Sequence, residues 1–453
     1  MARQYIIIGN GAAGLSAAEA IRARDGQGRI TIITDEPLPF YSRPGLAYYL
    51  RGDLPEKQLF SRPRDYYEQQ RFEVITGRAT KLDPDSKTVT IAGSHRLSYD
   101  RLLIATGSRA VKPAMPGIDL QGVVTLDNMA DVQSILRLTK KARRAVVVGG
   151  GITALEMVEG LQVRGVETHY LLRKDRFWSN LLDESESRLV EDRLREHDIA
   201  IYRREELAEI QGKKGRVHAV RTKAGRTLPC DMVGVAIGVR PNLDLIADTT
   251  IARDRGILVD DHLRSSVPDV YAAGDVAQVL DRWSGEYKLD VLWPTALATG
   301  RVAGANMAGA HEHFLKGPPF NAALLCGLHL TIIGQAAADP RIGTGDDLVG
   351  ISRGSSEVWF SRTSEDYAII SWRQPEGSQR IVVRGPAIVG ALLLGDDQTL
   401  ADPLRDLISG EADTSPIRQR LFSEHDTPLT DIVQPFWETW KKANRPNEER
   451  REA

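Results

Sequence analysis

Three glycines that follow an apolar run near the start of the chain offer the clearest chemistry in the sequence. Residues 5–8 indicate a buried strand, and Gly9, Gly11 and Gly14 follow it in the spacing G-x-G-x-x-G, with Ala13 inside the motif. The first glycine permits a tight turn, the second lets a pyrophosphate approach the backbone, and the third lets a helix pack close to the strand. N–H groups at the start of such a helix bind phosphate. The pattern predicts a dinucleotide site.

A pair of carboxylates follows the next predicted strand. Residues 29–34 are rich in β-branched side chains, and Asp35 and Glu36 come directly after them. In a dinucleotide-binding fold, an acidic residue at this point accepts hydrogen bonds from the ribose hydroxyls. Arg43 follows, and its planar guanidinium suits a pyrophosphate. We therefore expect these three side chains at the cofactor.

The same glycine pattern occurs a second time. Residues 145–148 are apolar, Gly149 and Gly151 follow them, and Ala154 stands where the third glycine stood; Gly149 comes 140 positions after Gly9. Two such patterns are much harder to obtain by accident than one. The repeat predicts two nucleotide-binding units in one chain.

The second unit differs from the first in the residues after its next strand. This strand, 168–172, ends at Leu172 without a carboxylate, and Arg173 and Lys174 follow. Cations at this position favour a ribose that carries a 2′-phosphate. The second glycine motif (the second cradle, as the motif at Gly9 is the first) therefore leans toward NADPH, and NADH stays open as the alternative.

Length and composition place the chain among globular proteins of more than one domain. It has 453 residues, 42% of them hydrophobic and 26% charged, and a formal net charge of -2. This balance gives no basic field for nucleic acid or for an acidic membrane surface. The two cysteines, Cys230 and Cys326, have no metal-ligand spacing and fit a reducing compartment. With no leader peptide and no apolar run long enough to span a bilayer, a cytoplasmic location is expected.

The order of the elements predicts an α/β protein with two Rossmann-like domains and a third, C-terminal α+β domain. Prolines near 112–117 indicate that the chain leaves the first domain, and 236–242 mirrors this exit on the way back. We expect the first domain at 1–115 and 245–317, the second at 116–244, and the C-terminal domain at 318–453. Short strands are expected in the last at 357–360, 367–372, 380–383 and 388–394, followed by a helical tail.

Together these motifs resemble the flavoproteins with two dinucleotide-binding domains that are related to pyridine nucleotide-disulphide oxidoreductases, in the branch of rubredoxin reductases, nitrite-reductase flavin modules and NADH oxidases. Besides the two cradles, residues 105–107, 236–242 and 271–275 carry the resemblance. It implies FAD in the first cradle and NAD(P)H in the second. The cofactor-binding residues that motifs and resemblance imply are Gly9, Gly11, Ala13, Gly14, Asp35, Glu36, Arg43, Pro44, Ala105, Thr106, Gly107, Gly149, Gly151, Ala154, Arg173, Lys174, Gly238, Gly274 and Asp275.

The departures from the family concern residues beside the flavin. Pro44 stands where thiol-using members carry a redox cysteine, so a flavin that passes electrons directly is expected. Glu156 matches a family glutamate that pairs with a lysine, yet Tyr48 occupies the lysine position, which leaves a carboxyl whose pKa apolar surroundings would raise. Trp293 falls near the place where electron-transfer relatives put an aromatic ring. The candidate catalytic residues are Glu156, Trp293 and Tyr48.

The resemblance implies an FAD-dependent NAD(P)H oxidoreductase that passes hydride to flavin and electrons on to a protein or small-molecule acceptor of rubredoxin, ferredoxin or nitrite-reductase type. The acceptor is not identified, and a small iron protein is one option; no nucleic acid or membrane partner is expected. Two alternatives stay open: an NAD(P)H oxidase or quinone reductase of broad acceptor range, and a slow-turnover sensor that acts by redox-dependent partner binding.

Two C-terminal features have competing interpretations. The stripe Phe436, Trp437 and Trp440 would offer the sensor a docking face, although packing on its own chain is the simpler expectation. A homodimer through the C-terminal domain is also left open. Before that domain, His311 and His313 flank Glu312, too close together for a metal site, so none is expected.

Overall fold

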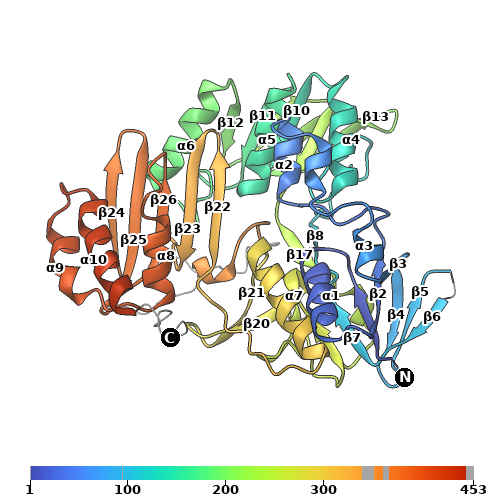
Figure 1. Cartoon of the computed structure of the whole chain (residues 1–453). Helices are drawn as coiled ribbons and strands as arrows, with labels where there is room; N and C mark the ends of the chain where they lie inside the picture. The colour runs from blue at the N-terminus through green and yellow to red at the C-terminus, as the bar shows by residue number, and fades with distance from the viewer. Residues whose placement is uncertain (1, 94, 339–350, 361–366, 445–453) are drawn as a thin grey trace. The chain divides into compact units, whose positions relative to one another are not determined.

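The computed structural model describes the whole chain except residues 1, 94, 339–350, 361–366 and 445–453 (Figure 1). The chain divides into two compact units. The first comprises Met1–Asp175, His197–Lys316 and Leu348–Glu357, and the second comprises Arg176–Glu196, Gly317–Asp347 and Val358–Ala453. Both nucleotide cradles belong to the first unit.

Two parallel sheets with the same internal plan form the framework of the first unit. In each, the strand before the glycines pairs with the strand that follows the helix on one side and with a strand from later in the chain on the other. One sheet has the order β19 (Val270–Ala272), β7 (Arg101–Ile104), β1 (Gln4–Ile8), β2 (Arg29–Thr34) and β3 (Phe72–Thr76). The other has the order β12 (Ala200–Arg203), β11 (Glu167–Leu172), β10 (Arg144–Val148), β16 (Met232–Val235) and β9 (Val123–Val124). The α/β class with two Rossmann-like sheets is confirmed.

Smaller sheets and helices complete this unit. The antiparallel strands are β4 (Ala79–Asp83), β5 (Thr88–Ile91) and β6 (His95–Ser98); β13 (Leu207–Lys213), β14 (Arg216–Thr222) and β15 (Thr227–Pro229); and β8 (Ser108–Ala110) with β17 (Val239–Pro241). A mixed sheet holds β18 (Ile257–Leu258), β20 (Ala277–Asp281) and β21 (Glu286–Leu289). The helices are α1 (Ala12–Arg24), α2 (Gly45–Arg51), α3 (Tyr66–Gln69), α4 (Met129–Thr139), α5 (Ile152–Val163) and α7 (Trp293–Met307), with 3-10 turns η1 (Glu56–Leu59), η2 (Asp244–Ile246) and η3 (Gly274–Val276).

Helix α7 packs against α1 at unusually close range, and the two lie side by side in Figure 1. Two glycines of α7 permit this approach. A Cβ on Gly300 would lie 2.2 Å from the carbonyl oxygen of Ala13, and one on Gly304 would lie 2.3 Å from that of Ala17. Any larger residue at either position would push α7 away, so these glycines fix the helix against the first cradle.

The second unit has one antiparallel sheet, in the order β22 (Phe320–Leu325), β23 (Leu328–Gly334), β26 (Ala387–Leu394), β25 (Gly377–Arg384) and β24 (Tyr367–Gln374). Its helices are α8 (Ala401–Ser409), α9 (Ser415–Ser423), α10 (Leu429–Asn444) and α6 (Glu184–Glu196). The predicted C-terminal α+β fold is confirmed. The strand expected at 357–360 is wrong, because these residues form a 3-10 helix, η4 (Glu357–Phe360), that buries Trp359 and Phe360.

Helix α6 comes from the middle of the sequence but belongs to the second unit. Its Glu186 pairs with Arg380 of β25 at 2.8 Å, and both side chains are almost fully buried. Arg380 also donates to the carbonyl oxygens of Leu181 and Ala336. These two compact units therefore do not follow the three predicted domain ranges, which stay a prediction.

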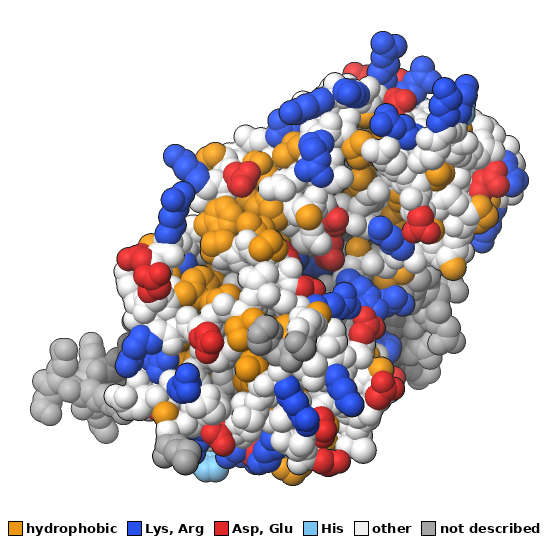
Figure 2. Space-filling view, turned by 90° about the vertical axis from the view of Figure 1, so that its right-hand side faces the viewer, with side chains coloured by type: hydrophobic (Ala, Val, Ile, Leu, Met, Phe, Trp, Pro, Cys, Tyr) orange, Lys and Arg blue, Asp and Glu red, His pale blue; other side chains and the backbone are white. Residues whose placement is uncertain are grey.

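The surface is of mixed charge. Figure 2 shows one face on which Lys and Arg side chains are interspersed with Asp and Glu, beside a group of exposed hydrophobic side chains. In the described part of the chain, no helix combines the length and the hydropathy needed to cross a bilayer.

Candidate functional site

The first cradle forms as its glycines predict. Gly9 leaves β1 with φ of +117°, and a Cβ there would lie 2.1 Å from the carbonyl oxygen of Ala105. A Cβ on Gly14 would lie 1.9 Å from the carbonyl oxygen of Gly9, so the start of α1 can sit against the turn only with glycine. A Cβ on Gly11 would meet nothing within 4 Å. The N-terminus of α1 therefore has free space beside Gly11, as a bound pyrophosphate requires.

The segment 273–275 lies directly against this cradle. A Cβ on Gly274, whose φ is +75°, would lie 2.9 Å from the Cβ of Ala13. The hydroxyl of Ser108 donates to Asp275 at 2.6 Å. Burial raises the pKa of Asp275, and Ser108 and Arg43 oppose that rise. The segment forms a three-residue 3-10 turn, η3, that begins at Gly274.

The two acidic residues that follow β2 differ in their exposure and in their hydrogen bonds. Asp35 is exposed, whereas Glu36 accepts hydrogen bonds from Arg43 and from the hydroxyl of Tyr41, the latter at 2.6 Å. Arg43 also donates to the carbonyl oxygen of Asp127 at 2.8 Å. Although burial opposes it, the partners Tyr41 and Glu36 hold the pKa of Arg43 above its ordinary value. Arg43 therefore stays charged.

The two chain crossings between the domains are joined to each other. Strands β8 and β17 pair antiparallel, and the backbone N–H of Val111 donates to the carbonyl oxygen of Gly238. Asn242 donates to the carbonyl oxygen of Thr106 at 2.8 Å, and its own N–H donates to Gly107 at 2.9 Å. The predicted small residues at 105–107 thus meet the returning chain.

The second cradle repeats the geometry of the first at its first glycine and differs at its second, where Ser352 lies close to Gly151. Gly149 has φ of +146°, and a Cβ there would lie 2.1 Å from the carbonyl oxygen of Ala236 and 3.0 Å from the Cβ of Ala154. The residue Ala236 follows β16 as Ala105 follows β7. A Cβ on Gly151 would lie 2.3 Å from the hydroxyl oxygen of Ser352. Arg173 and Lys174, both exposed, follow β11 at the same edge of the sheet as Gly149.

Glu156 on α5 is a predicted catalytic residue whose pKa is strongly raised. Its pKa is raised to about 7, first by burial and then by the charge of Glu159, while Arg51 opposes the rise. Its side chain keeps intermediate exposure, which places the carboxyl deep in the protein but within reach of a ligand. The raised pKa expected from the sequence is confirmed.

The cation that the sequence analysis missed is Arg51, at the end of α2, which lies beside α5 in Figure 1. Arg51 pairs with Glu159 at 3.5 Å and with Asp53 at 2.5 Å, and its guanidinium carbon lies 4.9 Å from the ring centroid of Tyr48. A Cβ on Gly160 would lie 2.6 Å from Leu50, so the two helices touch. The ring of Tyr48 thus stacks on the guanidinium of Arg51, so a cation remains next to the position where the resemblance places a lysine.

Trp293 is the first residue of α7, and Pro44 immediately precedes α2. The Trp293 ring centroid lies 5.7 Å from that of Phe40, and the side chain is partly buried against the core of the first unit. The contact with Phe40 holds the indole near the loop that leads to Arg43.

Neither cysteine has the environment of a redox thiol. Cys230 is buried in an apolar cluster, and burial raises its pKa to about 12. The thiolate that redox chemistry needs is therefore scarce at neutral pH. Cys326 is buried at the turn between β22 and β23.

Besides Arg51, sequence reasoning missed four side chains at the cradles and the crossings between them: Ser108, Asp127, Ser352 and Arg353. Arg353 pairs with Asp127, and burial lowers its pKa to about 9. Ile351, beside it, bonds to Val239 in both directions. No local pattern marks this segment, because its position depends on strands far away in the sequence.

The site fits FAD in the first cradle. It offers free space at Gly11, the carboxylate of Glu36 after β2, a charged Arg43, and Gly274 against Ala13 with the Asp275 carboxyl next in the chain. Together with the second cradle, these features define a flavoprotein oxidoreductase with two dinucleotide sites.

Comparison with known proteins gives the same class. Residues 3–300 match the family model described as pyridine nucleotide-disulphide oxidoreductase. The chain is 30% identical over 442 residues to the NAD(P)H nitrite reductase of Bacillus subtilis. The match covers 96% of this chain and 49% of that protein. It is 32% identical to the NADH-rubredoxin oxidoreductase of Clostridium acetobutylicum, over 68% of this chain and 75% of that protein.

Among solved structures, the covalent putidaredoxin reductase–putidaredoxin complex matches with a TM-score of 0.82 and 22% identity, covering 96% of this chain and 98% of the other. The chain belongs to the pyridine nucleotide-disulphide oxidoreductase family, in the branch of nitrite reductases and rubredoxin reductases. It is an oxidoreductase whose cofactors are FAD and NAD(P)H. The chain spans about half the length of the nitrite reductase it matches.

Proposed function

We propose that the protein is an NAD(P)H-dependent electron-transfer reductase that passes electrons from FAD to a separate protein-held iron centre of rubredoxin, ferredoxin or nitrite-reductase type. The observation that carries the proposal is that one unit contains two dinucleotide cradles and no thiol suited to redox chemistry. Pro44 occupies the redox-cysteine position, and burial raises the pKa of Cys230 to about 12. Electrons then have no cysteine relay to pass through.

Bound FAD supplies the exchange between a two-electron hydride donor and one-electron acceptors. The protein's own residues bind and orient. Glycines 9 and 14 hold the N-terminus of α1 where a pyrophosphate would bind, Glu36 would accept from the ribose, and Arg43 would offset the phosphate charge. Asp275, whose carboxylate accepts a hydrogen bond from Ser108, would bind the ribityl chain or the pyrophosphate of FAD.

Glu156 is the residue that meets the nicotinamide in this proposal. A carboxyl with a pKa of about 7 is a mixture of acid and carboxylate at neutral pH. The neutral form donates a hydrogen bond to a carboxamide oxygen, and the carboxylate accepts from the amide nitrogen. Glu156 therefore orients the nicotinamide, while Arg51 and Glu159 hold α2 against α5 behind it.

One of the relatives is named for an iron-protein acceptor. The NADH-rubredoxin oxidoreductase of Clostridium acetobutylicum is named for rubredoxin, whereas the nitrite reductase is named for a small molecule. An oxidase or quinone reductase of broad acceptor range is the second candidate, because no described residue selects an iron protein.

The sensor alternative loses the feature that favoured it. Trp437 donates its indole N–H to Asp406 at 3.1 Å, and a Cβ on Gly410 would lie 2.5 Å from Trp440. With Phe436, these side chains pack on the core of the second unit. They are therefore committed to their own chain.

Anaerobic stopped-flow spectroscopy tests the proposal. We expect NAD(P)H to bleach the flavin, and rubredoxin or ferredoxin to reoxidise it faster than air-saturated buffer or a quinone does. Faster reoxidation by oxygen would favour the oxidase. A reduced flavin that persists with every acceptor would favour the sensor.

A further inference from the structure

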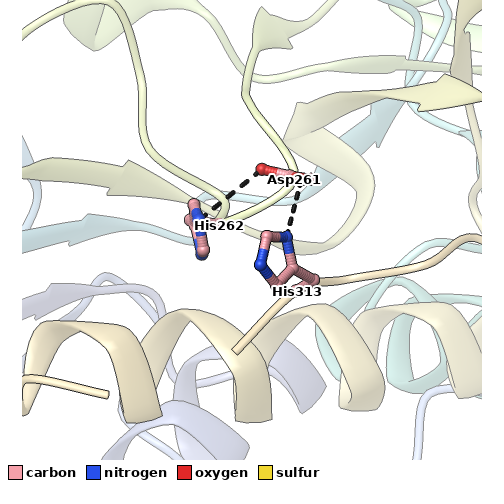
Figure 3. A group of neighbouring side chains, drawn as sticks. All are labelled: Asp261, His262 and His313. Atoms are coloured by element: carbon pink, nitrogen blue, oxygen red, sulfur yellow. Dashed lines mark hydrogen bonds and ion pairs between the residues drawn. The ribbon is translucent and has the colours of Figure 1, made fainter. Parts of the chain in front are cut away.

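Two histidines and an aspartate meet where the loop after β18 passes the segment that follows α7 (Figure 3). Asp261 and His262 lie in the loop, and His313 lies in the segment. The Nδ1 of His313 is 2.7 Å from Asp261 Oδ2, the Nε2 of His262 is 3.8 Å from Asp261 Oδ1, and the two ring centroids are 4.3 Å apart. We propose that this cluster binds a divalent transition-metal ion of the zinc type and thereby ties the loop to the end of α7.

The orientation of His262 fits a metal ligand. Its Nδ1 lies 2.9 Å from the carbonyl oxygen of Glu312. Because a carbonyl oxygen only accepts, this Nδ1 carries a proton, so the lone pair of the neutral imidazole is on Nε2, which faces Asp261. An imidazole fixed by a backbone carbonyl through one nitrogen, with the other nitrogen free, is the usual state of a metal-binding histidine.

A buried asparagine holds the two chain segments in register. Asn306, 3% exposed near the end of α7, donates to the carbonyl oxygens of His262 at 3.0 Å and Glu312 at 2.8 Å, and accepts from the N–H of Glu312. The N–H of Phe314 donates to the carbonyl oxygen of Asp261. The backbones that carry the three side chains are thus fixed before any ion binds.

The donor atoms need only a small adjustment. One nitrogen or oxygen of each residue lies within 4.8 Å of the others. Tetrahedral zinc, with bonds of about 2.0–2.1 Å, places its ligands about 3.3 Å apart. Asp261 and His313 keep 53% and 57% of their side-chain surface exposed, so both can rotate inward.

The donor set also selects the class of ion. Two imidazoles and one carboxylate suit zinc, nickel, copper or cobalt, whereas magnesium and calcium prefer all-oxygen sites. Three protein ligands leave a fourth position for water. The sequence alone hid this site, because His313 finds its partners about fifty positions earlier in the chain and not in its neighbour His311.

Calorimetric titration of the tag-free, FAD-loaded full chain with zinc chloride tests the proposal. We expect one ion per chain with a micromolar Kd, and a rise in melting temperature on zinc addition. Asp261→Asn, which keeps the shape of the side chain, and His313→Ala, at an exposed position, should each weaken zinc binding at least about tenfold.

The matched control is His329→Ala. His329 is exposed and lies 3.7 Å from Asp396 in the second unit, and among the described residues no third metal-binding side chain joins this pair. This variant should bind zinc as the wild type does. The proposal is overturned if the wild type binds no stoichiometric zinc, or if both site variants bind it as tightly as the wild type.

Discussion

The guanidinium of Arg51 lies 3.5 Å from the carboxylate of Glu159. This ion pair joins α2 of the first nucleotide domain to α5 of the second. Glu156 lies one turn earlier on α5, and Arg51 is engaged by Glu159 and by Asp53. Burial first, and then the charge of Glu159, raise the pKa of Glu156 to about 7, and Arg51 opposes that rise.

Replacing Glu156 by Gln should change how stability depends on pH. Between the ordinary pKa of 4.5 and the folded value of about 7, the folded chain holds a proton that the unfolded chain has lost, so stability falls as pH rises through this window. The Gln variant has no carboxyl group at this position, so it does not lose stability in this way as the pH rises. Relative to the wild type, its free energy of unfolding should gain about 1–3 kcal/mol between pH 5 and pH 8, as measured by urea unfolding.

Glu209→Gln provides the control for this measurement. Glu209 bonds to Arg221 and Gln211, which lower its pKa to about 2, so its charge is constant over the same pH range. Its variant should follow the wild-type pH profile. Parallel profiles for Glu156→Gln and the wild type would contradict the raised pKa.

Replacing Gly11 by Ala should release FAD without unfolding the protein. A Cβ at Gly11 meets nothing within 4 Å of protein and its φ is -89°, so the chain tolerates alanine there. The methyl group would occupy the space that the pyrophosphate needs, and FAD affinity should fall at least about tenfold, or about 1.4 kcal/mol. Flavin retained after gel filtration measures this.

Gly26→Ala is the matched control, because a Cβ at Gly26 also meets nothing within 4 Å and this turn lies outside the cradle. It should keep its flavin. Equal flavin content in both variants would show that the first cradle does not hold the pyrophosphate at Gly11.

The cradles could be predicted because their determinants are local. Gly9, Gly14 and Gly149 act on atoms that the same short turn brings together or that the neighbouring parallel strand supplies. The repeat predicted two nucleotide-binding units, and the central strands of the two sheets, β7-β1-β2 and β16-β10-β11, have the same order. The 3-10 helix at 357–360 was missed, since Trp359 and Phe360 are buried by tertiary packing and not by alternation along a strand.

The side chains that tune the site were less accessible to sequence reasoning. Ser108 reaches Asp275, which is 167 positions later, and Arg353 reaches Asp127, which is 226 positions earlier. Arg51 was within reach, since it lies three residues after Tyr48 on one helix face, a spacing at which side chains meet.

Removing both thiols should leave electron transfer intact. In the Cys230→Ser, Cys326→Ser double variant we expect NAD(P)H-driven reduction of an artificial acceptor at close to the wild-type kcat, because burial and a pKa of about 12 keep the Cys230 thiol inert. Buried hydroxyls would cost about 1–3 kcal/mol of stability. A loss of turnover with FAD retained would contradict the direct route.

Arg173 and Lys174 should determine the choice between NADPH and NADH. They follow β11 at the edge of the sheet where Gly149 begins the second cradle, and Leu172 before them offers no carboxylate to a ribose. In the Arg173→Ala, Lys174→Ala variant, loss of the contacts to the 2′-phosphate should reduce kcat/KM for NADPH about 10- to 100-fold. The value for NADH should change little, because NADH has no phosphate at that position.

The control for this pair is Lys140→Ala, Lys141→Ala, which removes the same charge from exposed residues that precede β10, at the opposite edge of the sheet. It should leave the ratio of the two kcat/KM values unchanged. If the Arg173 and Lys174 variant loses NADPH and NADH activity equally, these cations steady the cradle as a whole and do not read the 2′-phosphate. A wild-type preference for NADH would likewise remove the basis for the assignment, since a 2′-phosphate reader raises the affinity of one cofactor only.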